Sequence, residues 1–155
     1  MSGAEAGAVR MAVGETFGQR VTFDVGSIRE FATRVGDFNP LHHDAHIARA
    51  GPYGTIIASG THPTALMMAA TATHFSRGHQ PLGLEFRFRF VRAVLAGLSL
   101  DLRWTIVDVK RKDSLAGDIV TLDGQACDDA GVAYVTGEAK LLVRPAIARP
   151  AAMEG

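Results

Sequence analysis

One long uncharged segment constrains the fold more than any other feature of this sequence. If Thr61–Phe75 is drawn as a helix, its side chains form almost no charged face, and the next charged residue is Arg77. Pro63 falls in the first turn, where a missing N–H costs little. A helix that is apolar nearly all round is normally buried. The segment therefore predicts a long buried central helix, with Gly78 as its C-terminal stop.

The second half of the chain has the period of strands. Residues 84–90, LEFRFRF, alternate apolar and charged side chains. The alternation continues over residues 98–109 with a shift before Val107, and residues 117–143 indicate two strands joined by a turn at DDAG. A short strand is also expected over Val21–Val25. Helices followed by strands predict an α+β fold with an antiparallel sheet wrapped around the central helix.

Composition limits the class of protein. The chain has 155 residues, of which 47% are hydrophobic and 21% charged, as in an ordinary single-domain globular protein. We expect one domain over residues 13–143, with flexible termini at residues 1–12 and 144–155. A net charge of zero gives no reason to expect a nucleic-acid partner, and the longest apolar runs are too short to span a membrane. One cysteine, Cys127, and no secretory signal predict a cytoplasmic location.

A helix is expected over residues 28–35, with Ser27 as N-cap in a capping box with Glu30 and with Gly36 as a left-handed stop. Asp37 then follows the helix in an irregular segment. Asp44 is expected to cap a second short helix over residues 45–50.

Asp37 and His42 are the first candidates for chemistry. Their separation fits neither one helical turn nor one strand face, so only a turned loop brings both side chains to one point, and Asn39-Pro40 favours such a loop. A carboxylate beside an imidazole suits acid–base catalysis near neutral pH. The alternative is that Asp37 caps backbone amides and His42 is a surface residue.

A metal site is the other interpretation of this histidine-rich stretch. It would use His42, His43, Asp44 and His46, with the first and last one helical turn apart. Asp44 resembles a helix cap, however, and neither a nearby cysteine nor an H-E-x-x-H pattern is present. We therefore predict no metal, with His43 and His46 as surface residues.

The stretch Ala58–His62, ASGTH, enters the central helix. A helix N-terminus favours an oxyanion, and Gly60 would let a carbonyl approach the backbone. The alternative is an ordinary Ser/Thr helix cap. Combined with an acid–base pair, this stretch suits proton transfer next to a thioester carbonyl.

Other sequence signals are weaker. No G-x-S-x-G, G-x-G-x-x-G or P-loop pattern occurs in the sequence. Cys127 is expected in the core of a strand and not as a nucleophile. Arg87, Arg89 and residues 110–112 could meet phosphates, but more often such residues form a solvated sheet face and a loop.

The segment FATRVGDFNPLHHDAHIARAGPYGTIIASG resembles the signature of the MaoC-like dehydratases, the (R)-specific enoyl-CoA hydratases with a hotdog fold. The matching positions are Gly36, Asp37, Asn39, Pro40, His42, Asp44 and the IIASG turn. Two positions depart from the pattern. Met68 stands near a place where many members have serine, with Thr61 or Thr64 as possible replacements, and the turn at residues 93–98 lacks its usual proline and aspartate.

The resemblance implies hydration of a trans-2-enoyl-CoA, or the reverse dehydration, by Asp37 and His42. Asn39 would orient this pair, and the Gly60 N–H would bind the thioester oxygen. Further candidates for substrate contact are Ser59, Thr61, Thr64 and Met68.

It also implies no metal or redox cofactor, since coenzyme A arrives with the substrate, and a homodimer or higher hotdog oligomer. Rival functions are a hotdog thioesterase and a non-catalytic acyl-CoA-binding partner subunit. Met67, Met68 and nearby alanines would either line an acyl tunnel or pack in the core. Acyl chain length stays open, as does which of Asp37 and His42 handles which proton.

Overall fold

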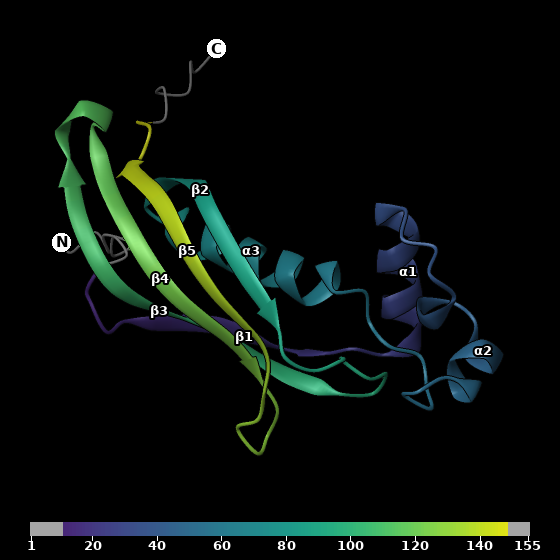
Figure 1. Ribbon diagram of the computed structural model, residues 1–155. Helices are drawn as coiled ribbons and strands as arrows, with labels where there is room; N and C mark the ends of the chain where they lie inside the picture. Colours follow the sequence, from purple (N-terminus) through teal and green to yellow (C-terminus); the bar gives the residue numbers. More distant parts are fainter. Residues whose placement is uncertain (1–10, 149–155) are drawn as a thin grey trace, which may run out of the picture.

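The computed structural model describes residues 11–148, which form one five-stranded antiparallel sheet and three helices. The elements are β1 (Thr16–Thr22), α1 (Val25–Val35), α2 (Ala45–Ala50), α3 (Thr61–Phe75), β2 (His79–Phe90), β3 (Ser99–Lys112), β4 (Gly117–Cys127) and β5 (Ala133–Pro145). The strand order is β1-β3-β4-β5-β2. α3 lies along one face of the curved sheet, while α1 and α2 lie together beyond one end of it (Figure 1). The predicted α+β fold, an antiparallel sheet around a central helix, is confirmed.

Trp104 of β3 joins the sheet to α3. Its side chain is fully buried, and its indole Nε1 donates a hydrogen bond of 2.8 Å to the carbonyl oxygen of Met67. Gly124 and Gly137 lie opposite each other on β4 and β5. A Cβ at Gly124 would overlap the Trp104 ring, and a Cβ at Gly137 would lie 2.8 Å from the ring of Phe88. The glycine pair therefore makes room for large rings between the sheet and α3.

Several local predictions are confirmed. α3 has the predicted bounds, and the shift in β3 falls between Ile106 and Asp108. Gly36 ends α1 with a φ of 76° in the left-handed region. Asp44 caps α2, because its carboxylate accepts the N–H groups of His46 and Ile47. The DDAG stretch forms the hairpin between β4 and β5, with Gly131 at a φ of 78°.

The start of α1 was predicted wrongly. The N-cap is Asp24 and not Ser27, because the Asp24 carboxylate accepts the Ser27 N–H at 2.8 Å. A carboxylate at this position satisfies a free N–H and interacts favourably with the positive end of the helix. Val25 consequently belongs to α1, and the first strand is β1 and not residues 21–25.

The prediction that α3 is buried all round was also wrong for the single chain. The sheet covers one side of the helix (Figure 1). Met68 of this helix is 41% exposed. The helix ends at the cap residue Ser76, before Gly78. None of the helices in the described part of the chain is long and apolar enough to cross a membrane.

The edge strand β2 departs from strict alternation. Phe86 and Phe88 pack against the core, whereas Leu84 and Phe90 are about half exposed. The register of β2 against β5 shifts between Gly83 and Glu85, which leaves Leu84 without a partner. β5 continues to Pro145, beyond the expected boundary at residue 143. Residues 1–10 and 149–155, most of the two termini predicted to be flexible, lie outside the described residues.

Candidate active site

A tight turn after α1 brings Asp37 and His42 together. The Asp37 N–H donates to the carbonyl of Ala32 at 2.8 Å, which fixes the chain as it leaves the helix. The Asn39 side chain then accepts the Leu41 N–H at 3.1 Å and caps a short 3₁₀ turn over Pro40–His42. This turn places His42 Nε2 at 3.2 Å from Asp37 Oδ2. The sequence prediction that a turned loop would join the two side chains agrees with this geometry.

The His42 ring is buried, and its second nitrogen, the one that does not face Asp37, also has a partner. Its Nδ1 atom lies 2.8 Å from the carbonyl oxygen of Ile57. A carbonyl oxygen only accepts hydrogen bonds, so Nδ1 carries a hydrogen and Nε2 is the atom that faces Asp37. The alternative of His42 as a surface residue is therefore excluded.

The Asp37 carboxylate has one donor on each oxygen besides His42. Ser59 Oγ donates to Oδ2 at 2.5 Å, and the Asn39 N–H donates to Oδ1 at 3.2 Å. The Ser59 hydroxyl is the largest cause of a pKa of Asp37 below its ordinary value. Partial burial opposes this shift, while the Asn39 N–H and the nearby His42 and His43 add to it. Asp37 is consequently a carboxylate at neutral pH.

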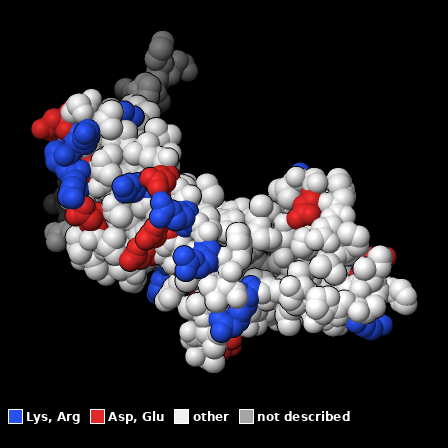
Figure 2. Space-filling view, viewed as in Figure 1, with Lys and Arg blue, Asp and Glu red and all other residues white. Residues whose placement is uncertain are grey.

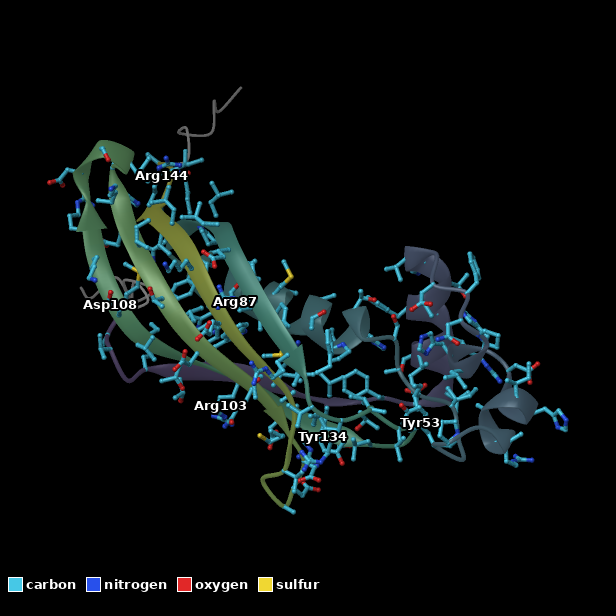
Figure 3. All side chains as sticks on the ribbon, viewed as in Figure 1. Tyr53, Arg87, Arg103, Asp108, Tyr134 and Arg144 are labelled. Carbon is cyan, nitrogen blue, oxygen red and sulfur yellow. The ribbon has the colours of Figure 1, made fainter. Side chains whose placement is uncertain are left out.

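His42 and Ser59 line a pocket of about 380 Å³, while Asp37, which contacts both side chains, is not part of its lining. Its lining includes His42, Ser59 and Gly60 on one side and Phe90, Val91, Arg92, Ala93 and Val94 on the other. Tyr53, which also lines the pocket, lies at the α2 end of the molecule, off the end of the sheet (Figure 3). The pocket thus collects residues from the turn after α1, the entry to α3 and the end of β2.

Gly60 is the N-cap of α3 and faces this pocket. Within residues 11–148, no backbone carbonyl accepts a hydrogen bond from its N–H. A Cβ at this position would lie 3.1 Å from the Phe90 ring. Gly60 therefore combines a free donor with space that a side chain would take from the pocket.

Three further residues, Thr61, Thr64 and Met68, were predicted to contact the substrate. Thr61 is exposed, and its hydroxyl lies 2.9 Å from Ser59 Oγ. The Thr64 hydroxyl bonds back to the carbonyls of Gly60 and Thr61, each at 3.2 Å. Met68 is exposed on α3. Thr61, Thr64 and Met68 are all absent from the lining of the pocket beside His42, so its geometry gives no support to substrate contact by these three side chains.

Met67 packs in the core and does not line a tunnel. Its side chain has no exposed surface, and its carbonyl accepts the Trp104 indole. Of the two interpretations of the methionine pair, packing is therefore the one that holds for Met67.

The four residues of the metal interpretation do not converge on one point. His43 Nε2 donates to the backbone carbonyl of Asp37 at 2.7 Å, and the Asp44 carboxylate is occupied as the cap of α2. His46 is exposed on α2. Across residues 11–148, no group of three or more His, Cys, Asp or Glu side chains is placed to hold a metal ion. His43 is half-buried against the loop, so its prediction as a plain surface residue was wrong.

Cys127 ends β4 and is partly buried. Burial raises the pKa of its thiol, and the carboxylates of Asp128 and Asp101 raise it further. A thiol kept protonated in this way is a poor nucleophile.

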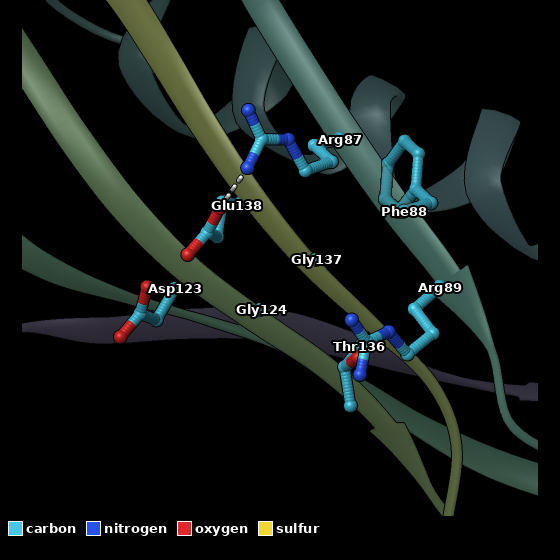
Figure 4. A pocket seen from close by; sticks show the side chains of 8 residues that line it. All are labelled: Arg87, Phe88, Arg89, Asp123, Gly124, Thr136, Gly137 and Glu138. Atoms are coloured by element: carbon cyan, nitrogen blue, oxygen red, sulfur yellow. Dashed lines mark ion pairs between the residues drawn. The ribbon is translucent and has the colours of Figure 1, made fainter.

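A larger hollow, about 630 Å³, lies on the outer face of the sheet and not beside the acid–base pair. Charges of both signs are interspersed over this face (Figure 2). Arg87 lies 3.7 Å from Glu138 across the strands, while Arg89 and Asp123 border the same hollow (Figure 4). The outward arginines thus form a solvated sheet face, as predicted, and this hollow is separate from the pocket that His42 and Gly60 line.

Sequence reasoning missed the second wall of the pocket and the group that orients His42. The wall comes from residues 90–94, at the end of β2 and just after it, and these residues contain no recognisable motif. The group that orients His42 is the backbone carbonyl of Ile57, which no side-chain pattern in the sequence could have indicated. Ser59, which was expected to contact substrate, lines the pocket, and its hydroxyl is also bonded to Asp37, a contact that the sequence did not indicate.

Comparisons with known proteins identify relatives. The family model described as "MaoC like domain" matches residues 9–123. A UPF0336 protein of Streptomyces griseus is 39% identical over 145 residues, covering 86% of this chain and 93% of its own. A 3-hydroxybutyryl-CoA dehydratase of Methylorubrum extorquens is 31% identical over 104 residues, covering 62% and 66%. The unliganded R-hydratase PhaJ1 from Pseudomonas aeruginosa superposes with a TM-score of 0.76 at 26% identity, covering 87% of this chain and 83% of its own.

Proposed function

The chain belongs to the MaoC-like domain family, and from that premise we propose that it hydrates a trans-2-enoyl-CoA to the (R)-3-hydroxyacyl-CoA or catalyses the reverse dehydration. The observation that carries the proposal is the approach of His42 Nε2 to Asp37 Oδ2 at 3.2 Å, with His42 lining the same pocket as Gly60. The names of the dehydratase and the R-hydratase among its relatives support the same reaction class.

In the proposed reaction, Asp37 and His42 hold a water molecule and exchange protons with it and with the substrate. One group takes a proton from the water as its oxygen bonds to C3, and a proton is delivered to C2. A hydrogen and a hydroxyl are thereby added across the double bond, with no net change in the protonation of the enzyme. Because the reaction is a simple addition of water, coenzyme A enters only as part of the substrate.

Negative charge develops on the thioester oxygen when water adds to C3. The free N–H of Gly60, at the positive end of α3, is the proposed donor to that oxygen. Asn39 contributes through the loop, since its side chain caps the turn and its N–H holds Asp37. The proposed assignment is therefore Asp37 and His42 as catalytic residues, Gly60 as oxyanion donor and Asn39 as a positioning residue.

We also expect the chain to act as a homodimer or higher oligomer. β2 is an edge strand, and Leu82 on it is 54% exposed in the single chain. An unpaired strand edge with apolar side chains is a surface that proteins normally cover. Light scattering on the purified protein would measure its mass in solution, and a monomer would contradict this expectation.

The hydration can be tested by following the loss of conjugated enoyl-thioester absorbance with acyl-CoAs of several chain lengths. Asp37→Asn and His42→Ala should each lower kcat/KM by about 10²–10⁴. His46→Ala, on the exposed face of α2, is the matched control and should leave the rate unchanged, as should a chelator. Release of free coenzyme A would instead favour a thioesterase. Saturable binding without turnover would favour a partner subunit.

A further inference from the structure

Ser59 is buried at the entry to α3, with 2% of its surface exposed, and its hydroxyl contacts two polar partners. One is Asp37 Oδ2 at 2.5 Å and the other is Thr61 Oγ1 at 2.9 Å. An ionised carboxylate has no hydrogen to give, so Ser59 must donate to Asp37. Its single hydrogen is then used, and Thr61 must donate to Ser59. The hydroxyls form an ordered chain from the exposed Thr61 to the carboxylate.

The carboxylate oxygen that receives the Ser59 hydroxyl is the one that faces His42. Nδ1 of His42 donates to Ile57, and Nε2 of the same ring lies 3.2 Å from this oxygen. A hydrogen bond to the charged form of Asp37 favours the ionised carboxylate.

We propose that Ser59 is a positioning residue for Asp37, which keeps the carboxylate ionised with Oδ2 turned toward His42, and that Thr61 fixes the direction of the Ser59 hydroxyl. This inference rests on the proposed function, because it assigns Ser59 a part in the acid–base pair. It replaces the expectation that Ser59 binds substrate, since the one hydrogen of its hydroxyl is already committed.

The other neighbours of Asp37 explain why Ser59 is needed. His42 faces it from the 3₁₀ turn and His43 from the start of the next loop, and both lower the pKa of Asp37 less than the Ser59 hydroxyl does. The Asn39 N–H is the only other donor to this carboxylate among the described residues. Removing the Ser59 hydroxyl therefore leaves one backbone donor and two imidazoles, and Asp37 takes up a proton at a higher pH than before.

The kinetic test compares the pH dependence of enoyl-CoA hydration in four single variants. Ser59→Ala should move the acid limb of kcat/KM to higher pH and lower the rate on that limb by about tenfold or more. Thr61→Val should move it less, and Thr61→Ser should restore it. Thr71→Val removes a buried hydroxyl of α3 whose one hydrogen-bond partner among the described residues is the Met68 carbonyl, and it should leave the limb in place. A higher KM for Ser59→Ala with an unmoved acid limb would overturn the inference in favour of substrate binding.

A second measurement does not depend on activity. Carboxyl ¹³C NMR follows the protonation of Asp37 in the unliganded protein, and its titration midpoint should rise in Ser59→Ala and less so in Thr61→Val. An unchanged midpoint in folded variants overturns the role of Ser59 and leaves the proposed hydration untouched. A shifted midpoint in a protein without any turnover supports Ser59 and overturns the hydration instead. If Ser59→Ala does not fold, Thr61→Val alone carries the comparison, and an unmoved midpoint there overturns the chain of hydroxyls.

Discussion

His42 Nδ1 and the carbonyl oxygen of Ile57 lie 2.8 Å apart, although the two residues are separated by 15 positions in the chain. The carbonyl fixes which ring nitrogen carries the hydrogen and which one faces Asp37. Ile57 is itself held, because it forms an isolated antiparallel bridge with Leu95 and the next residue, Ala58, donates to the carbonyl of Val94. The orientation of the proposed catalytic ring thus depends on the loop between β2 and β3.

Gly60→Ala should lower kcat/KM for hydration by between about tenfold and a hundredfold. The added Cβ lies 3.1 Å from the Phe90 ring, so that ring must move within the pocket beside the proposed oxyanion donor. Steady-state kinetics would measure the loss. Because the Phe90 contact is the cause, Gly60→Ala should lower the activity less in a Phe90→Ala background than in the unchanged protein, and a fully additive loss in the double variant would contradict this explanation.

Gly124→Ala should destabilise the protein by about 1–3 kcal/mol through overpacking against Trp104. Gly137→Ala is the matched comparison on the neighbouring strand. Its Cβ meets Phe88, which is only partly buried and has more room to shift, so the free energy of unfolding should fall less. Urea denaturation of both variants checks the order, and an equal or larger loss for Gly137→Ala would show that Trp104 can move.

Asp24→Ala should lower the midpoint of thermal unfolding more than Ser27→Ala does. Asp24 is the residue whose carboxylate accepts a free N–H of α1, whereas the Ser27 hydroxyl donates to the Asp24 carbonyl. Removing the cap leaves a backbone donor without its partner. The opposite order would restore Ser27 as the cap that the sequence favoured.

The free energy of unfolding should fall as the pH drops below about 6.5, the ordinary pKa of histidine. His62 is stacked on Phe31, with ring centroids 4.4 Å apart, and its buried Nδ1 has no hydrogen-bond partner among the described residues. Burial lowers the pKa of His62, against a smaller opposing effect of Asp24. Unfolded chains therefore bind the proton more readily, and stability is lost as the pH falls from the unfolded value through the folded one.

Urea denaturation between pH 7.5 and pH 5 measures this loss. His62→Phe keeps an aromatic ring against Phe31 and removes the titrating group, so its stability should depend less on pH over that range. His74 has a pKa lowered by burial in the same direction, which leaves part of the dependence in place. If the free energy of unfolding of His62→Phe depended on pH as strongly as that of the unchanged protein, a group other than His62 would be its cause.

Sequence patterns alone located most of the elements, because those patterns record local physics. The charge-free run predicted the bounds of α3 correctly. Gly36 marked the end of α1, Asp44 marked the start of α2, and the break in alternation after Ile106 marked the register shift in β3. The spacing of Asp37, Asn39-Pro40 and His42 also predicted a loop that turns two polar side chains to one point. All of these depend on residues within a few positions of one another.

The errors share a physical cause, which is that burial and capping depend on what lies nearby in space. Nothing in the apolar run of α3 says that the sheet covers only one side of it and leaves Met68 exposed. Asp24 and Ser27 are both good caps, and the choice followed from where β1 ends and the helix begins.

The sequence by itself determined the fold class, the central helix and the identity of the Asp37–His42 pair. Only the tertiary structure decided which nitrogen of His42 faces the carboxylate, which wall closes the pocket, and that the Ser59 hydroxyl is bonded to Asp37. Those decisions need atoms from segments distant in sequence, since a hydrogen bond is set by position and direction in space. The Ile57 carbonyl shows this most directly, because a backbone oxygen is present at every residue and only the fold selects this one.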